Sequence, residues 1–361
     1  MLVTVNGLAA SPLAYMEVDS INITWIALYY VILATAVATS YKRKTSLIFK
    51  VPAQIKSGAS QSAAFLWRLP MKWVVPPLAM VALLVTIVAA TMPDDDIHVS
   101  FLNVGQGDAI LVRQGNQQVL IDGGPSLQAI NLELGRQMPF WDRTIELVVL
   151  THPDQDHLAG LIEVLRRFRV ERVLCPDIDD GPPLYGEWQK LIAVKRIEKM
   201  PAQAGQRIDF GDVTIRVLHP PSTLLANTGD DVDNNSIVLR LATGRVSFLL
   251  SADIRQEAEF YLIANRAELH STVLKVAHHG SDTSTTPEFL SVIKPQLAII
   301  SVGADNKFGH PNQDVVERLE EKLGNESIFR TDQHGTVEFI TDGERLWIRM
   351  TPELDWQDRD K

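Results

Sequence analysis

The sequence predicts an α/β domain of stacked sheets flanked by helices, preceded by a membrane region. Three observations lead to this prediction: two long uncharged runs near the N-terminus, many short strand-like runs bounded by turn residues, and helical patterns between those strands from the middle of the chain onward. The chain has 361 residues, of which 46% are hydrophobic, so it can bury a sizeable core.

The two uncharged runs predict transmembrane helices. They separate Asp19 from Lys42 and Lys72 from Asp94. Each is about as long as a helix needs to cross a bilayer, which is roughly 20 residues. A buried or interfacial helix is the alternative, but such helices rarely stay uncharged over this length. We therefore predict a membrane region over residues 1–96, with two transmembrane helices at about 20–41 and 73–93.

The charges around these runs predict their orientation. Seven basic and no acidic residues lie between them: Lys42, Arg43, Lys44, Lys50, Lys56, Arg68 and Lys72. The positive-inside rule makes this segment cytoplasmic. We therefore expect a multi-pass protein of the cell membrane, with the N-terminus and the domain after residue 96 on the extracytoplasmic side. The first 16 residues lack the basic start of a signal peptide and are similar to the end of another membrane helix, so we expect the chain to begin within a larger membrane protein.

The acidic balance of the remaining chain limits its partners. The first 97 residues carry seven basic and five acidic side chains, and the rest carries 27 basic and 39 acidic ones, within a net charge of −10. That balance is not typical of a free-standing domain that binds duplex nucleic acid. Cys175 is the single cysteine, which excludes an internal disulfide and a cysteine-based zinc knuckle.

The elements of the second domain, residues 97–361, follow a short polar linker. Runs rich in β-branched and aromatic residues predict strands within 97–104, 109–114, 118–124, 144–152, 213–220, 236–242, 246–253, 272–280, 297–303 and 335–341. Apolar residues at helical spacing predict helices at 158–170, 254–265, 286–293 and 312–324. Strands with interleaved helices indicate stacked sheets covered by helices.

The stretch "THPDQDH" places four ligand-type side chains between a predicted strand and a predicted helix. They are His152, Asp154, Asp156 and His157. This position is where α/β proteins present active-site groups, and an irregular loop would let the four converge on one or two cations. Imidazole and carboxylate bind zinc, manganese or iron. Capping of the helix is the alternative, but it explains one aspartate and neither histidine.

Here the sequence resembles the metallo-β-lactamase fold, an αββα sandwich of two mixed sheets flanked by helices. Its H-x-H-x-D-H signature is matched by "HPDQDH", with Asp154 in place of the second histidine. The resemblance implies that Asp122 in "LIDGG" braces the metal loop. It also implies that Asp253 bridges two metals and that His279, or else His278, in "KVAHHGS" is the late ligand.

The third-motif histidine of that fold is missing from its expected place. The segment there is "DVDNNSIVLRL", so Asp233, Asn234 or Asn235 can substitute, and His219 in "VLHPP" is a less favoured candidate. We include Asn235 in the predicted ligand set.

A narrower resemblance is to the ComEC family of competence proteins, in the C-terminal hydrolase domain with the last membrane helices. It covers roughly residues 97–350 and keeps the order of seven motifs: "FLNVGQGDAILV", "LIDGG", "THPDQDHLAG", "NNSIVLRL", "KVAHHGSDTS", "SVGADNKFGHP" and "RTDQHG". Asn103, where the family commonly has aspartate, and Ala252, in place of glycine, depart from the pattern without removing an expected ligand. Most of the family's channel and its N-terminal DNA-binding region are absent.

The ComEC resemblance implies a membrane-tethered, metal-dependent nuclease that hydrolyses DNA phosphodiesters during uptake in natural transformation. The implied partners are DNA, the membrane, the remaining channel region and other DNA-uptake proteins. Two alternatives stay open: a phosphodiesterase of the same fold acting on phosphocholine or another small phosphodiester, and a catalytically silent module lining the DNA path. The intact ligand-type residues of "THPDQDH" and the presence of Asp253 argue against the silent module.

The predicted chemistry uses two divalent metal ions, which supply a nucleophile near neutral pH and stabilise both oxygens of an in-line displacement. We assign the first metal to His152 and Asp154, the second to Asp156, His157 and His279, and the bridge to Asp253. The hard oxygen ligand Asp154 favours manganese, with zinc as the alternative.

The predicted catalytic residues are Asp156, His278 and His310. We expect His278, Ser281 and His310 to contact the scissile phosphate, and His310 to protonate the leaving oxygen. The alternative for His310 is a structural role, as a loop histidine held by the turn "GHP", and the sequence supports both interpretations equally. For three further polar residues, structural roles are at least as well supported as catalytic ones: Lys275, Gln106 and Asp108.

Overall fold

The computed structural model describes residues 71–90, 94–139, 141–178 and 181–351. The predicted span at 20–41 lies outside these residues. The second uncharged run forms the helix α3 (Met71–Ala90), which contains Pro76 and Pro77. Within the described part of the chain, no helix meets both the length and the apolarity needed to cross a membrane. Helix α3 belongs to one compact unit, and the residues from 94 onward belong to another.

The first sheet of the larger unit has eight strands. Their order is β15 (Leu346–Thr351), β14 (Thr336–Thr341), β1 (Ile97–Phe101), β2 (Ile110–Gln114), β3 (Gln117–Ile121), β4 (Thr144–Val149), β5 (Arg169–Cys175) and β6 (Glu198–Pro201). Neighbours are antiparallel from β15 to β3 and parallel from β3 to β6. The sheet is therefore mixed.

The second sheet has seven strands and is also mixed. Their order is β13 (Ile328–Arg330), β12 (Leu297–Ile300), β11 (Val273–Lys275), β10 (Val246–Leu250), β9 (Val238–Thr243), β8 (Val213–His219) and β7 (Arg207–Phe210). Neighbours are parallel from β13 to β10 and antiparallel from β10 to β7.

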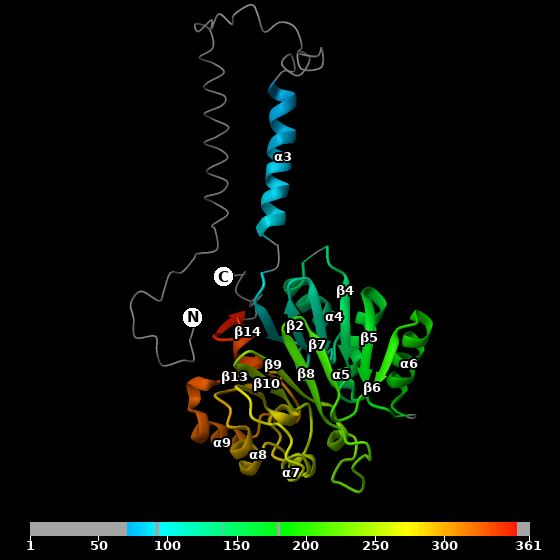
Figure 1. The fold of residues 1–361 in the computed structure, drawn as a ribbon, viewed down its shortest axis with the longest axis vertical. Coiled ribbons are helices and arrows are strands. Elements are labelled where there is room, and N and C mark those ends of the chain that lie inside the picture. Colours follow the sequence, from blue (N-terminus) through cyan, green and yellow to red (C-terminus); the bar gives the residue numbers. More distant parts are fainter. Residues whose placement is uncertain (1–70, 91–93, 140, 179–180, 352–361) are drawn as a thin grey trace, which may run out of the picture. The chain divides into compact units, whose positions relative to one another are not determined.

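The larger unit has four layers: two sheets, each with helices on its outer face (Figure 1). Three hydrophobic cores lie between these layers. The central core joins the inner faces of both sheets, where Phe339 meets Phe101 and Phe248 edge to face. A second core packs α4 (Leu127–Gln137), α5 (Gln155–Arg167) and α6 (Pro183–Lys195) on the first sheet. A third packs α7 (Gln256–Ala264), α8 (Pro287–Ile293) and α9 (Gln313–Leu323) on the second. The predicted αββα sandwich is confirmed.

Short segments complete the larger unit at the strand ends. They are η2 (Asp233–Asn235), η3 (Ala277–Gly280), η4 (Asn325–Ser327) and α10 (Thr331–His334). Three of the described helices begin with a side-chain cap. The hydroxyl of Ser126 accepts a backbone N–H of α4, the hydroxyl of Thr286 accepts one of α8, and the side chain of Asn312 accepts one of α9.

One predicted boundary is wrong in a way that bears on the site. Helix α5 begins at Gln155, three residues before the predicted start, so Asp156 and His157 lie in its first turn rather than in an irregular loop. Asp154 occupies the N-cap position, yet its side chain makes no capping hydrogen bond. Capping therefore does not account for Asp154.

Candidate metal centre

Strand ends of both sheets bring the predicted residues together. His152 follows β4, Asp253 follows β10, and His279 lies on η3 directly after β11. The parallel strands β3 and β4, and likewise β10, β11 and β12, end at common edges of their sheets. We use the name metal cluster for these residues together with their neighbours: His152, Asp154, Asp156, His157, Asp233, Asp253 and His279.

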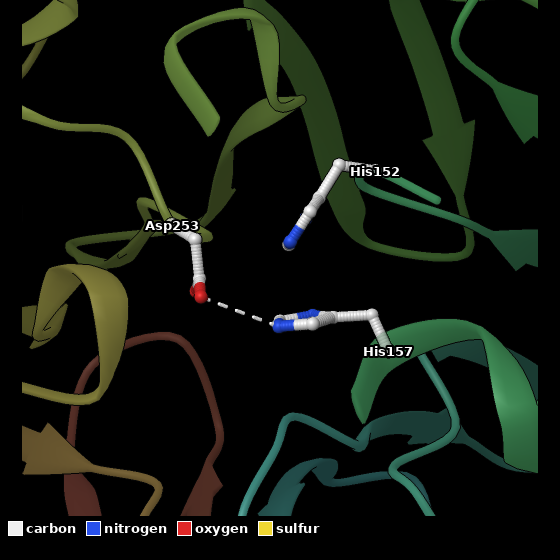
Figure 2. A group of neighbouring side chains, drawn as sticks. All are labelled: His152, His157 and Asp253. Atoms are coloured by element: carbon white, nitrogen blue, oxygen red, sulfur yellow. Dashed lines mark ion pairs between the residues drawn. The ribbon is translucent and has the colours of Figure 1, made fainter. Parts of the chain in front are cut away.

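Three buried imidazole nitrogens and one carboxylate converge at the centre of the cluster. The Nε2 atoms of His152, His157 and His279 are buried and have no hydrogen-bond partner. Asp253 Oδ2 lies 3.4 Å from His157 Nε2 and 3.1 Å from His279 Nε2. Figure 2 shows His152 and His157 pointing toward a common space beside the Asp253 carboxylate. Unpaired buried nitrogens are costly, so this arrangement fits a bound cation.

The other ring nitrogen of each histidine is held by the protein. His157 Nδ1 donates to Asp122 Oδ2 at 2.9 Å, and His279 Nδ1 donates to the carbonyl of Ser301 at 2.9 Å. His152 Nδ1 lies 3.0 Å from the hydroxyl of Thr151. Partners of this kind fix the ring orientation and leave Nε2 as the ligand atom.

Asp122 performs the bracing role that the resemblance implied. Its Oδ1 accepts the backbone N–H of Thr151 at 2.8 Å, and its Oδ2 accepts the hydroxyl of Thr151 at 2.6 Å as well as the ring of His157. One carboxylate therefore ties the end of β4 to the first turn of α5.

The side chains form two candidate cation groups around Asp253. His152, Asp154 and Asp233 offer ligand atoms within 4.8 Å of one another, and so do Asp156, His157 and His279. His152, His157 and Asp253 form a third such group that links the two. Among the described residues, the geometry thus brings together the predicted ligands of both metals, with Asp253 between them.

The charges of the cluster favour a cation at its centre. Burial acts to lower the pKa of both His157 and His279, but Asp253 and Asp122 raise the pKa of His157 well above its ordinary value, and Asp253 with Asp156 raises the pKa of His279 to about 10. Burial acts to raise the pKa of Asp253, yet His279 and His157 hold it well below its ordinary range. The carboxylates therefore stabilise positive charge where a divalent ion would sit.

Asp233 on η2 occupies the third-motif position. It is buried, and its carboxylate accepts a hydrogen bond from Arg255 Nε at 2.7 Å. Burial raises the pKa of Asp233 to about 7, and the nearby charge of Asp253 adds to this effect. Because its ionisation stays unfavourable even beside Arg255, this carboxylate would gain from a further cation held together with His152.

The other third-motif candidates make different contacts. The amide of Asn235, which we included in the predicted ligand set, bonds the backbone of Leu225 through both its oxygen and its nitrogen. The oxygen of Asn234 accepts the N–H of Ala258, and His219 Nε2 donates to the carbonyl of Asn234 at 2.8 Å. Asn234, Asn235 and His219 thus bond the segments around Asp233.

Two glycines allow the loops to approach this closely. A Cβ on Gly107 would lie 2.1 Å from the carbonyl oxygen of Asp156, and its φ of +138° is unfavourable for other residues. A Cβ on Gly160 would lie 1.8 Å from the carbonyl oxygen of Gly123. The motifs "VGQGD", "LIDGG" and "DHLAG" therefore carry glycine where backbones touch around the cluster.

Lys275 and Asp108 form a buried ion pair beneath the cluster. The Nζ of Lys275 contacts Asp108 Oδ2, lies 3.4 Å from Asp253 Oδ1 and donates to the carbonyl of Ala252 at 2.9 Å. Lys275 is fully buried. Lys275 lies near Oδ1 of Asp253, whereas the histidines lie near its Oδ2, which favours an orienting role for the ion pair. Gln106 likewise has a structural contact, since its side chain accepts the N–H of Gly303.

His278 and His310 line the cluster on one side. His278 Nε2 lies 4.0 Å from Asp253 Oδ2, and the rings of His278 and His310 stack with centroids 5.8 Å apart. His310 Nδ1 is buried without a partner. Ser281 is buried, and its hydroxyl pairs with that of Thr283 at 2.9 Å. His278 and His310 therefore lie beside the cluster, and Ser281 pairs with Thr283; their contacts with a phosphate stay predictions.

Comparison with known families defines the class of protein. The family described as metallo-beta-lactamase superfamily matches residues 102–304, more than half of the chain. The chain belongs to this superfamily, in agreement with its two mixed sheets and outer helices. The fold and its candidate metal groups support a metal-dependent hydrolase.

Within that class, similar proteins include members of the ComEC family. The chain is 30% identical to ComE operon protein 3 of Bacillus subtilis over 67% of its length, 28% identical to competence protein ComA of Neisseria gonorrhoeae over 77%, and 29% identical to recombination protein 2 of Haemophilus influenzae over 62%. The resemblance to the ComEC family is thereby confirmed. The chain covers 33%, 37% and 26% of these relatives' own lengths.

Proposed function

We propose that this chain is a metal-dependent nuclease of the ComEC type, which hydrolyses DNA phosphodiesters during DNA uptake. The observation that supports it best is the convergence of three unpartnered imidazole nitrogens on Asp253, in a chain whose relatives are competence proteins. Two bound divalent ions would supply a nucleophile at neutral pH and stabilise the charge that develops on the phosphodiester. Manganese is our favoured ion, and zinc is the alternative.

We assign each residue of the site a role in metal binding or in contact with the scissile phosphate. His152, Asp154 and Asp233 hold one ion, and Asp156, His157 and His279 hold the other. Asp253, fixed by Lys275, lies between them. The stacked rings of His278 on η3 and His310 in the loop between β12 and α9 lie beside Asp253, where His278 binds a phosphate oxygen and His310 gives a proton to the leaving oxygen.

We further propose that the hydrolase domain lies on the extracytoplasmic side of the cell membrane. This proposal depends on the two uncharged runs and on the seven basic residues between them. Its partners in that location are the DNA substrate, the membrane, the remaining ComEC channel and other uptake proteins.

The nuclease proposal is tested by incubating the full chain with end-labelled single-stranded and double-stranded DNA across a series of divalent metals. We expect cleavage with manganese, weaker cleavage with zinc and none with a chelator present. If both DNA forms stay intact with every metal, the nuclease proposal is wrong.

A second candidate substrate is a small phosphodiester such as a phosphocholine ester. The excess of 39 acidic over 27 basic residues after residue 97 favours it, because this charge repels a long polyanion. Cleavage of a chromogenic phosphocholine ester by a chain that leaves DNA intact would select this candidate. A chain that binds DNA and cleaves neither substrate would instead be the silent module.

A further inference from the structure

The loop between β12 and α9 presents an exposed phenylalanine in a fixed conformation. A single amide holds the loop: Asn306 Nδ2 donates to the carbonyls of Gly303 at 2.9 Å and of His310 at 2.6 Å. Asn306 Oδ1 accepts the N–H groups of Phe308 at 3.2 Å and of His310 at 3.0 Å. The loop therefore positions Phe308 relative to His310 through bonds of its own.

The rings of this loop extend a series that begins at the metal cluster. His278 lies beside Asp253 and stacks on His310 with an interplanar angle of 28°. The ring of Phe308 follows, with its centroid 5.9 Å from that of His310 and an angle of 37°. These distances are typical of interacting aromatic pairs. We use the name ring row for His278, His310 and Phe308, which lead from the cluster to the surface.

The outer end of the ring row is chemically suited to a nucleobase. The side chain of Phe308 is 59% exposed, although aromatic rings are usually buried. Lys307 Nζ lies 5.2 Å from the centroid of the Phe308 ring. A largely exposed aromatic ring with an ammonium group beside it is the combination by which proteins bind unpaired bases and the phosphates next to them.

We propose that Phe308 is the stacking platform for a base of single-stranded DNA close to the scissile phosphate, and that Lys307 contacts an adjacent phosphate. This inference rests on the proposed function and deepens it, because it names the single strand as the form of DNA that the cluster receives. A duplex keeps its bases stacked on each other and offers no free face to Phe308. The link to the cluster through His310 favours DNA over a membrane or a protein partner, since neither needs a row of rings that ends at metal ligands.

The test compares binding of a labelled oligothymidylate with binding of an abasic strand of the same length, in a chelator so that no cleavage occurs. The full chain is compared with Phe308→Ala, Phe308→Trp and the control Phe260→Ala, which removes a comparably exposed ring from α7. We expect Phe308→Ala to weaken oligothymidylate binding about tenfold, as stacking on one base does. We expect Phe308→Trp and Phe260→Ala to bind like the unchanged chain, and the abasic strand to bind equally weakly to Phe308→Ala and to the unchanged chain.

The outcomes separate this inference from the proposed function. Equal oligothymidylate binding by Phe308→Ala and the unchanged chain overturns the stacking role, even if the chain cleaves DNA with manganese. Loss of binding in Phe308→Ala by a chain that cleaves no DNA supports the stacking role and removes the nuclease. If Phe308→Ala instead loses binding to anionic lipid vesicles and keeps its binding to oligothymidylate, Phe308 is a membrane contact and the inference is wrong.

Discussion

Two charged clusters of this molecule, each with buried histidine, differ in the partners of the histidine nitrogens. In the metal cluster the Nε2 atoms of His152, His157 and His279 have no hydrogen-bond partner among the described residues, although the Asp253 carboxylate lies near two of them. In the second cluster, across β1, β2, β14 and β15, both ring nitrogens of His98 are bonded, to Glu338 at 2.8 Å and to Asp94 at 2.7 Å. We use the name His98 cluster for this second set: Asp94, His98, Arg113, Glu338 and Arg349.

The difference lies in what completes each cluster. Glu338 is surrounded by His98, Arg113 and Arg349, so its charge is balanced by side chains of the protein. The metal cluster is rich in carboxylates, and the Nε2 atoms of its imidazoles, which lack hydrogen-bond partners among the described residues, converge beside Asp253. A buried polar group without a partner is costly, so this cluster requires a ligand, whereas the His98 cluster is complete in itself. Burial and charge alone would not have separated the two.

The largest expected effect is on catalysis. Asp156→Ala removes a ligand of the second ion, and its hydrolysis rate should fall about a thousandfold or more, which corresponds to several kcal/mol of barrier. His98→Gln, the control in the other cluster, should stay within about twofold of the unchanged chain, since it touches no reacting group. Rates of DNA cleavage with manganese measure both. A comparable loss of cleavage rate in Asp156→Ala and His98→Gln would contradict the assignment of catalysis to the metal cluster alone.

The second effect is on stability. A cation that binds only the folded chain raises its free energy of unfolding, by about 2.7 kcal/mol at a hundredfold excess over the dissociation constant. Manganese should therefore raise the thermal midpoint of the unchanged chain and of His98→Gln, and much less that of Asp253→Ala. Because the pKa of His279 is raised to about 10, a cation must displace a proton from this ring in order to bind. The rise in thermal midpoint that manganese causes should therefore become smaller as the pH is lowered from 8 to 6. A gain that grows toward pH 6 would contradict this competition.

A third effect sharpens the distinction between the two candidate ions. Asp154, whose side chain is 48% exposed at the N-cap of α5, is our proposed hard oxygen ligand at the position where the metallo-β-lactamase signature has histidine. Asp154→His should move the ratio of activity with manganese to activity with zinc toward zinc, on the order of tenfold. Parallel assays of both proteins in each metal measure the ratio. An unchanged ratio would show that Asp154 does not set the metal preference.

The smallest effect concerns the His98 cluster. Burial acts to lower the pKa of His98, but Glu338 and Asp94 raise it above the ordinary value. The stabilisation from charged His98 is therefore complete below pH 6.5 and is lost as the pH rises through the raised pKa. His98→Gln should cost about 1 kcal/mol near pH 6, and less at pH 9. Urea unfolding at the two pH values measures the difference, and a cost that increases with pH would reverse the assignment.

The sequence predicted the parts of the site that are local in the chain. The spacing of His152 to His157 after an apolar strand predicts a cluster of ligand-type side chains, and the structure brings them together with Asp253 and His279. The choice among Asp233, Asn234 and Asn235 was not predictable from spacing. It depends on which side chain of η2 turns toward the cluster and which bonds its own loop.

Contacts between distant segments were also missed. The sequence did not predict roles for Asn306 and Phe308, because these depend on η3 and the loop between β12 and α9 meeting at His278 and His310. Helix α4 was missed because only Ile130, Glu133 and Leu134 of its residues are buried, which leaves a weak apolar pattern. Packing against α5 stabilises such a helix where its own sequence does not.

The contrast between the two clusters is tested most directly by counting bound ions. The full chain, His98→Gln and Asp253→Ala are equilibrated with manganese, freed of unbound metal and analysed for manganese per chain. We expect about two ions in the unchanged chain and in His98→Gln, and fewer than one in Asp253→Ala, because Asp253 lies between both candidate groups. Fewer than one ion in the unchanged chain, or an equal count in Asp253→Ala, would contradict the assignment of the unpartnered histidines to a metal centre.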